Sequence, residues 1–210
     1  MKTFDLFPTP VNHVPNAITK PLLKKLRKVI IDAKSITNNQ SNDLYHTNTN
    51  EFFEDLDEVK EVKKILLPHI EDFGEILFSD NLQWGFAGMW GNIMKKDGYQ
   101  YRHNHCNSFI SGVLYIDIPE GCSSTRFWRP EPSNFFHFMH VNSERNNYYN
   151  NAYINFDNVE GGDLILFPSY LHHDVPISES NEDRITIAFN CLPTHINVGY
   201  YEVDFKVKEL

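Results

Sequence analysis

The spacing of apolar residues divides this chain into a helical front and a β-rich back. Over residues 19–35, apolar side chains recur every three or four positions, the spacing of a helix that buries one face; they are Leu22, Leu23, Leu26, Val29, Ile30 and Ala33. Thr19 and Pro21 suit the N-cap and first turn of that helix. A second helical pattern covers residues 51–78, and Pro68 in its interior predicts two helices that meet there.

The pattern changes after these helices. Residues 35–50 are polar and rich in Asn and Ser, which predicts a loop. From about residue 82 onward, short apolar or alternating runs are separated by turn sequences such as the Lys-Lys-Asp-Gly of residues 95–98. They predict strands over residues 84–94, 109–118, 125–128, 135–141, 152–156, 163–168, 184–192 and 199–207. We therefore expect one domain, with residues 1–80 mostly helical and residues 82–210 forming a β-sandwich or barrel.

Composition narrows the class of protein. The chain has 210 residues, of which 41% are apolar, and this argues against disorder. A formal net charge of -9 argues against a broad nucleic-acid surface or an anionic membrane as partner. Three widely spaced cysteines do not form a disulfide framework, and neither a signal peptide nor a membrane-spanning run is evident. We expect a cytoplasmic protein whose oligomeric state the sequence leaves open.

His103 and His105 stand one residue apart before an apolar strand. On a strand, residues i and i+2 point to the same face, so the two imidazoles could hold one metal ion. Neutral imidazole suits iron, zinc, copper or nickel. An isolated pair of this kind is also compatible with two solvated histidines, so the choice between a metal site and a solvated pair depends on other parts of the sequence.

A third histidine and an arginine follow some 70 to 80 residues later. His172 or His173 comes just after the predicted strand 163–168, and a third imidazole would leave half of an octahedral metal open for catalysis. Arg184 heads a strand on which Arg184, Thr186, Ala188 and Asn190 share a face. An arginine that faces a protein interior needs an anion, and its shape suits a carboxylate. The alternative is an exposed arginine paired with Glu182 or Asp183.

Three stretches together resemble the 2-oxoglutarate/Fe(II) oxygenase family. They are "LFPTPV" at residues 6–11, "RHNHCNSFISGVLYIDIPEG" at 102–121, and "GDLILFPSYLHHDVPI" with "DRITIAFN" between residues 162 and 190. The resemblance implies a double-stranded β-helix (jelly roll), with Fe(II) and 2-oxoglutarate as cofactors. Its Phe-Pro-Ser-Trp-Leu-x-His pattern falls on residues 167–173.

The resemblance also implies roles for single residues. His173 would be the distal metal ligand, while His172 lies where the family varies. Arg184 and Thr186 would hold the far carboxylate of 2-oxoglutarate. Tyr115 would donate its phenol to the same carboxylate, and Asn92 would line the pocket.

The first metal-binding pair departs from the wider superfamily, which carries an acid where this chain has His105. Three ligand sets follow from this difference. His103, His105 and His173 could all bind; only one of the first pair could bind beside His173; or Asp117 or Asp174 could supply the third ligand. The three-histidine set is the one that we predict.

The predicted function is that of an Fe(II)- and 2-oxoglutarate-dependent dioxygenase. It would hydroxylate an unidentified small-molecule or peptide substrate and release succinate and carbon dioxide. Two alternatives stay open at this point, a metal-binding cupin that needs no 2-oxoglutarate and a jelly-roll module that only binds a ligand. Arg184 discriminates between them, because only the oxygenase needs this guanidinium buried and facing the metal.

Overall fold

The computed structural model describes residues 1–38, 41–47, 56–130, 147–149 and 151–206. Two helices lie in these segments, α1 (Lys20–Asp32) and α2 (Asp57–Phe78). The strands of the first part of the chain are β1 (Asn12–Val14), β2 (Ser35–Thr37), β3 (Ser41–Thr47), β4 (Trp84–His103), β5 (Ile110–Asp117) and β6 (Arg126–Trp128). Those of the second part are β7 (Tyr153–Asn155), β8 (Leu164–Pro168), β9 (His173–Val175), β10 (Arg184–Pro193), β11 (His195–Asn197) and β12 (Glu202–Asp204).

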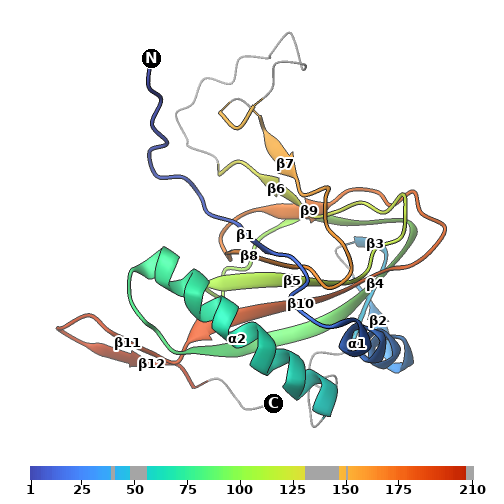
Figure 1. Ribbon diagram of the computed structural model, residues 1–210, viewed down its shortest axis with the longest axis horizontal. Coiled ribbons are helices and arrows are strands. Elements are labelled where there is room, and N and C mark those ends of the chain that lie inside the picture. The colour runs from blue at the N-terminus through green and yellow to red at the C-terminus, as the bar shows by residue number, and fades with distance from the viewer. Residues whose placement is uncertain (39–40, 48–55, 131–146, 150, 207–210) are drawn as a thin grey trace.

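The main sheet is antiparallel and curls into a half-barrel (Figure 1). Its strand order is β1-β8-β5-β10-β4-β9-β6-β7, with β3 also paired to β4 and β2 paired to β3. β4 joins the two halves of this sheet, since its first part pairs with β10 and its end pairs with β9. The predicted class, a mainly β protein with a jelly-roll core and helices packed on it, is confirmed.

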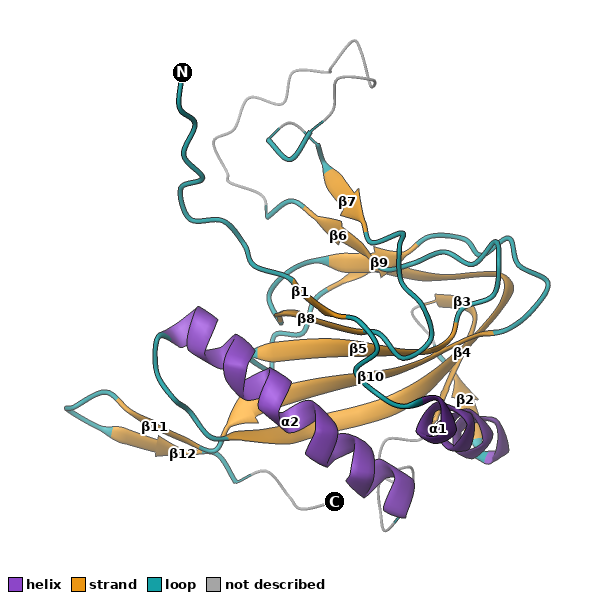
Figure 2. Ribbon diagram, in the orientation of Figure 1, coloured by secondary structure: helices purple, strands orange, loops and turns teal. Residues whose placement is uncertain are grey.

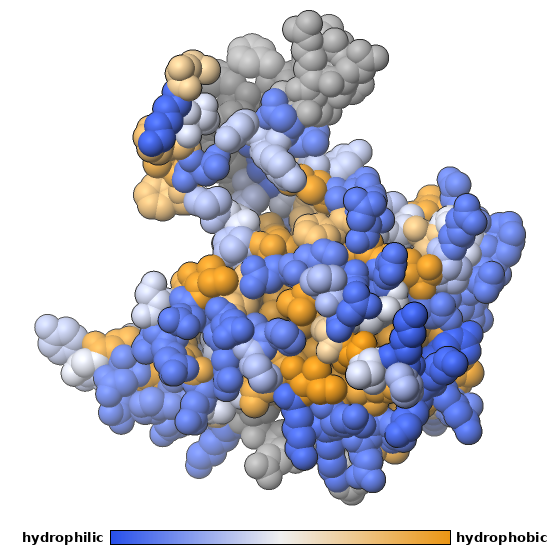
Figure 3. Space-filling view, viewed as in Figure 1, coloured by the Kyte–Doolittle hydropathy of each residue, from blue (hydrophilic) through white to orange (hydrophobic). Residues whose placement is uncertain are grey.

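The two helices cover the outer face of the sheet (Figure 2). α1 buries Leu22, Leu26 and Ile30, and α2 buries an equivalent stripe from Val59 to Phe73. Both stripes join the hydrophobic core that the strands supply. Each fully buried aliphatic side chain contributes roughly 1.5–3 kcal/mol, so tertiary burial stabilises these helices more than intrinsic propensity does. Polar side chains cover much of the visible face of the molecule (Figure 3), as the amphipathic pattern requires.

The prediction of two helices meeting at Pro68 is wrong. α2 runs without interruption from Asp57 to Phe78. Pro68 lies on its exposed face, while Leu66 and Ile70 on either side are fully buried. The proline removes one backbone hydrogen bond on the solvent side, and burial on the opposite side holds the two halves of the helix together.

Two further expectations need correction. The segment 35–50, predicted as loop, contains β2 and β3, because β3 hydrogen-bonds to β4 in a register that pairs His46 with Asn92. The turn predicted at residues 95–98 is a bend inside β4, where Asp97 adopts a φ of 62°. This bend directs the end of β4 from β10 toward β9. The strand predicted over residues 135–141 lies outside the described residues.

The C-terminal strands leave the main sheet. β11 and β12 pair only with each other and form a hairpin at one end of the molecule (Figure 1). Neither of the two described helices is long and apolar enough to cross a membrane.

Candidate metal centre

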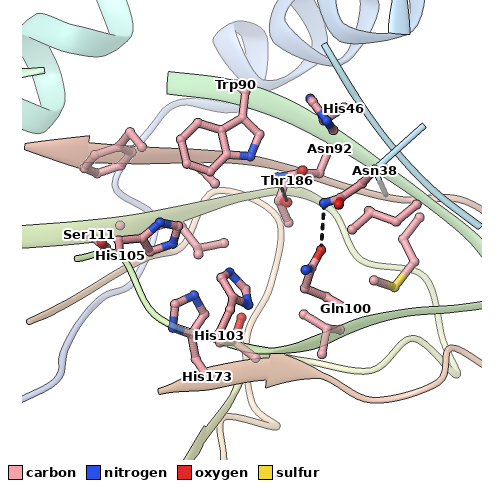
Figure 4. Close-up of a pocket in the computed structure, with 18 of the residues that line it drawn as sticks. Asn38, His46, Trp90, Asn92, Gln100, His103, His105, Ser111, His173 and Thr186 are labelled. Carbon is pink, nitrogen blue, oxygen red and sulfur yellow. Dashed lines mark hydrogen bonds between the residues drawn. The ribbon is translucent and has the colours of Figure 1, made fainter. Parts of the chain in front are cut away.

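The structure brings His103, His105 and His173 together in one cavity (Figure 4). His103 ends β4 and pairs directly with His173 at the start of β9. The ring centroids of these two lie 4.3 Å apart, and that of His105 lies 5.1 Å and 5.3 Å from them. One nitrogen from each residue lies within 4.8 Å of the others. The arrangement therefore offers three imidazole ligands around a single point.

Backbone carbonyls fix the tautomers of two of these histidines. His103 donates its Nδ1–H to the carbonyl of Tyr101 at 2.7 Å, and His173 donates its Nδ1–H to that of Leu171 at 2.9 Å. A carbonyl oxygen can only accept, so Nδ1 carries the proton in both rings. Nε2 of each ring is then a free lone pair, the usual state of a histidine that binds a metal.

Burial keeps the three imidazoles neutral. It is the main reason why the pKa of His173 falls to about 3 and that of His105 to about 4, and the neighbouring His103 contributes to both shifts. The pKa of His103 is also lowered by burial, although its bond to the Tyr101 carbonyl opposes this shift. Metal ions bind the neutral ring, so the charge state of all three imidazoles is compatible with a bound cation at neutral pH.

Arg184 lies in the same cavity and has no anionic partner among the described residues. The residue is 3% exposed, its Nε and Nη2 make no hydrogen bond to any described residue, and the centroid of the Tyr115 ring lies 5.4 Å from its guanidinium carbon. A buried charge without a partner is strongly unfavourable, so this guanidinium fits a carboxylate bound in the cavity. The alternative of an exposed arginine paired with its acidic neighbours is wrong, since Asp183 pairs with Lys95 at 2.6 Å.

The cavity between Arg184 and the histidines has a volume of about 390 Å³. Thr186 and Asn92 line it, and the Asn92 amide donates to Thr186 Oγ1 at 3.4 Å. The Tyr115 hydroxyl, predicted as a direct donor, donates instead to Thr125 Oγ1 at 2.7 Å. Thr125 lines the cavity and was missed in the sequence, because a threonine before a short strand carries no distinctive pattern.

No carboxylate of the described residues joins the histidine group. Asp174 points away from it and forms a bidentate pair with Arg126 at 2.7 Å and 2.5 Å. Asp117 pairs with Arg27 at 2.6 Å. His172, the other candidate for the distal position, does not line the cavity, whereas its neighbour His173 does.

A comparison with protein families matches residues 88–190 to the family described as 2OG-Fe(II) oxygenase. No curated protein matches the sequence. The fold is similar to HygX from Streptomyces hygroscopicus, solved with nickel, 2-oxoglutarate and hygromycin B (TM-score 0.65, 14% identity, 89% of this chain and 84% of that one). It is also similar to an oxidoreductase of the 2OG-Fe(II) oxygenase family from Burkholderia pseudomallei (TM-score 0.61, 13% identity, 87% and 84%). A third similar structure is the 2-oxoglutarate complex of the viral collagen prolyl hydroxylase vCPH from Paramecium bursaria Chlorella virus-1 (TM-score 0.55, 14% identity, 86% and 94%).

The curled sheet and the histidine cluster beside a buried arginine define a jelly-roll oxygenase. Through residues 88–190 the chain belongs to the 2OG-Fe(II) oxygenase family, as the resemblance implied. It is thus an oxidoreductase that uses iron and 2-oxoglutarate.

Proposed function

We propose that His103, His105 and His173 hold Fe(II) and that Arg184 anchors 2-oxoglutarate for the hydroxylation of a small-molecule or peptide substrate. The observation that carries this proposal is a buried guanidinium, two of whose nitrogens make no hydrogen bond to the described residues, in the same cavity as three neutral imidazoles. The donor set suits the metal, because imidazole is a good ligand for Fe(II) and three ligands leave positions open. Together the bound iron and 2-oxoglutarate would supply the oxidising chemistry, with release of succinate and carbon dioxide.

The residues around the ion would orient the co-substrate. Arg184 would receive the far carboxylate in a bidentate pair, which fixes the orientation of the molecule. Thr186 and Asn92, linked to each other, would add hydrogen bonds to it. Thr125 has a hydroxyl proton left to donate, since its oxygen already accepts from Tyr115. Tyr115 would act through Thr125 and through the packing of its ring against the guanidinium.

The hydrophobic part of the cavity would exclude water from the reacting groups. Phe167 packs on the His173 ring, with 4.7 Å between ring centroids, and Trp90 lies 6.0 Å from His105. Such contacts also hold the imidazoles in place. The choice of substrate class is supported by the similar structures, since HygX was solved with hygromycin B and vCPH is described as a collagen prolyl hydroxylase.

The test is an anaerobic titration of the purified protein with Fe(II) and 2-oxoglutarate. We expect a weak visible charge-transfer band, and succinate release once oxygen is admitted. His173→Ala should lose the band. Arg184→Met should weaken 2-oxoglutarate binding by at least about 30-fold, because removing one member of a buried charge pair costs roughly 2–5 kcal/mol.

His195→Ala is the control for these variants. His195 lies on β11, where it pairs with Asp204 away from the cavity, so its removal should leave the band intact. The proposal fails if the wild-type protein gives neither band nor succinate. It also fails if Arg184→Met binds 2-oxoglutarate as tightly as the wild type.

A further inference from the structure

A chain of polar side chains leads from His105 to the surface of the molecule. The Asn190 amide nitrogen lies 3.3 Å from His105 Nδ1, and Asn190 Oδ1 accepts from the Ser111 hydroxyl at 2.7 Å. Ser111 Oγ is 2.8 Å from Ser169 Oγ, which in turn is 2.9 Å from Ser108 Oγ. We call these four side chains (Asn190, Ser111, Ser169 and Ser108) the serine–asparagine relay.

Three members of the relay are buried. Ser169 is 0% exposed, Ser111 1% and Asn190 8%, whereas Ser108 is half-buried and forms the outer end. Buried hydroxyl and amide groups need partners, and each group in this relay finds its partners mainly among the others. All hydrogen bonds of such a chain must therefore run in one direction, either toward His105 or away from it.

The direction of the relay determines where the His105 proton lies. In the orientation that the structure shows, the Asn190 amide donates to His105 Nδ1, which leaves the ring proton on Nε2. A protonated Nε2 cannot bind a metal. This is the opposite of His103 and His173, whose Nδ1–H groups are held by carbonyl oxygens.

Rotating the Asn190 amide by half a turn reverses the whole chain. Oδ1 then accepts from His105 Nδ1–H, and the amide nitrogen donates to Ser111. Ser111 can donate to Ser169, and Ser169 to Ser108, since the hydroxyl protons are free to rotate. Every buried group keeps a partner, and Nε2 of His105 becomes a free lone pair.

We propose that Asn190 is the positioning residue of His105, and that the direction of the serine–asparagine relay decides whether His105 offers Nε2 to the metal. The inference rests on the proposed function, because it assigns His105 as the third ligand. In the metal-free protein the relay runs inward and His105 is not ready to bind. When a metal binds, the relay runs outward and Asn190 Oδ1 accepts from His105 Nδ1–H. Asn190 then holds the His105 ring as the backbone carbonyls hold His103 and His173.

Two substitutions at Asn190 separate this role from mere packing. Asn190→Asp replaces the amide by a carboxylate, whose two oxygens can only accept, one facing His105 and the other facing Ser111. His105 must then carry its proton on Nδ1 with or without metal. Asn190→Leu keeps the size of the side chain but offers no hydrogen bond to the ring. Ser178→Ala is the matched control, since Ser178 is another fully buried serine that lies outside the relay.

The test combines nitrogen-15 NMR of labelled histidines with Zn(II) titration, Zn(II) serving as a diamagnetic probe. In the wild type we expect the His105 proton on Nε2 without metal and on Nδ1 with Zn(II). In Asn190→Asp it should be on Nδ1 already before zinc is added. Asn190→Leu should bind Zn(II) about 10- to 100-fold more weakly, the usual effect of losing such a partner, and Ser178→Ala should match the wild type.

The inference is overturned if metal-free Asn190→Asp keeps its His105 proton on Nε2. It is likewise overturned if Asn190→Leu binds Zn(II) as tightly as the wild type. A wild-type protein that binds neither Zn(II) nor Fe(II) would contradict the proposed function instead. In that case the metal-free spectra of the wild type and Asn190→Asp still decide whether the relay sets the tautomer.

Discussion

At the scale of single residues, the cavity depends on polar groups that are not fully hydrogen-bonded within the protein and can form a further bond with a ligand. Thr125 is an example, because its oxygen accepts from Tyr115 while its own proton can be donated into the cavity. Arg184 is the extreme case, with two nitrogens that make no hydrogen bond to any residue that the structure describes. Such partly satisfied buried groups are costly in the free protein, and a ligand with matching charge removes that cost.

Thr125→Val is therefore expected to raise the dissociation constant of 2-oxoglutarate about tenfold, corresponding to roughly 1.4 kcal/mol for one lost hydrogen bond. Tyr115→Phe should have a smaller effect, because its hydroxyl reaches the ligand only through Thr125. Calorimetric titration of the Fe(II)-loaded protein measures both. The neighbouring Ser124→Ala, which removes a hydroxyl bonded to Asp157, is the control. If Tyr115→Phe raises the dissociation constant more than Thr125→Val does, the Tyr115 hydroxyl binds 2-oxoglutarate directly.

At the scale of elements, close contact between strands positions the site. β5 lies beside β10 in the sheet, with Gly112 directly opposite Phe189. A Cβ atom on Gly112 would lie 2.6 Å from Cε2 of the Phe189 ring, so no larger residue fits without displacing it. Both residues line the cavity, and Phe189 adjoins Asn190 of the serine–asparagine relay. The glycine thus fixes the spacing on which the site depends.

Gly112→Ala should destabilise the protein by about 1–3 kcal/mol or more, the usual cost of overpacking a core. Gly88→Ala on β4 is the matched control, since a Cβ there would meet nothing closer than 3.9 Å. Urea unfolding of both variants gives the comparison. Phe189→Leu in the Gly112→Ala background should recover part of the loss. Equal stability of the two alanine variants would show that the ring moves aside at little cost.

At the scale of the whole molecule, we propose that the helical front and the β-rich back form one domain. The buried stripes of α1 and α2 belong to the same core as the strands. Asp163, just before β8, adds a polar link to the N-terminal segment: its carboxylate accepts from His13 at 2.8 Å and from the backbone N–H of Asn16 at 2.9 Å. These contacts join residues about 150 positions apart.

The Asp163 link should make stability depend on pH. Burial alone would raise the pKa of Asp163, but the bonds from Asn16, His13 and Glu160 lower it below its usual value. A carboxyl with a lowered folded-state pKa stabilises the protein above its unfolded pKa of about 3.9, and this stabilisation disappears as the pH falls through the lower folded value.

Asp163→Asn should accordingly lower the free energy of unfolding at neutral pH by about 2 kcal/mol. The difference from the wild type should shrink steadily below about pH 4. Urea unfolding across this pH range measures it, with the exposed Asp80→Asn as control. A difference that does not change with pH would mean that the carboxylate charge contributes nothing.

Local patterns were enough to predict much of this protein. The helical spacing around Leu26 appears in the structure. So does the alternation along β10, where Arg184, Thr186 and Ala188 line the cavity and the isoleucines between them join the core. Both follow because the side-chain direction of a regular element is set by its backbone period. The His-x-His pair and the later segment ending at His173 likewise identified the three histidines that meet.

Other features depended on contacts between distant segments, and local sequence does not encode these. The β4–β9 register places His103 opposite His173, and burial against the sheet lets α2 continue through Pro68. Pairing with β4 turns a polar Asn-rich segment into β3. Thr125 came to light only because the folded chain places it in the wall of the cavity, where it accepts from Tyr115. The serine–asparagine relay depends on hydrogen bonds between residues 58 to 85 positions apart. The sequence by itself determined which residues could bind a metal and form the core, and the tertiary structure decided which of them meet, because a hydrogen bond or a ligand set requires atoms to be close in space rather than in sequence.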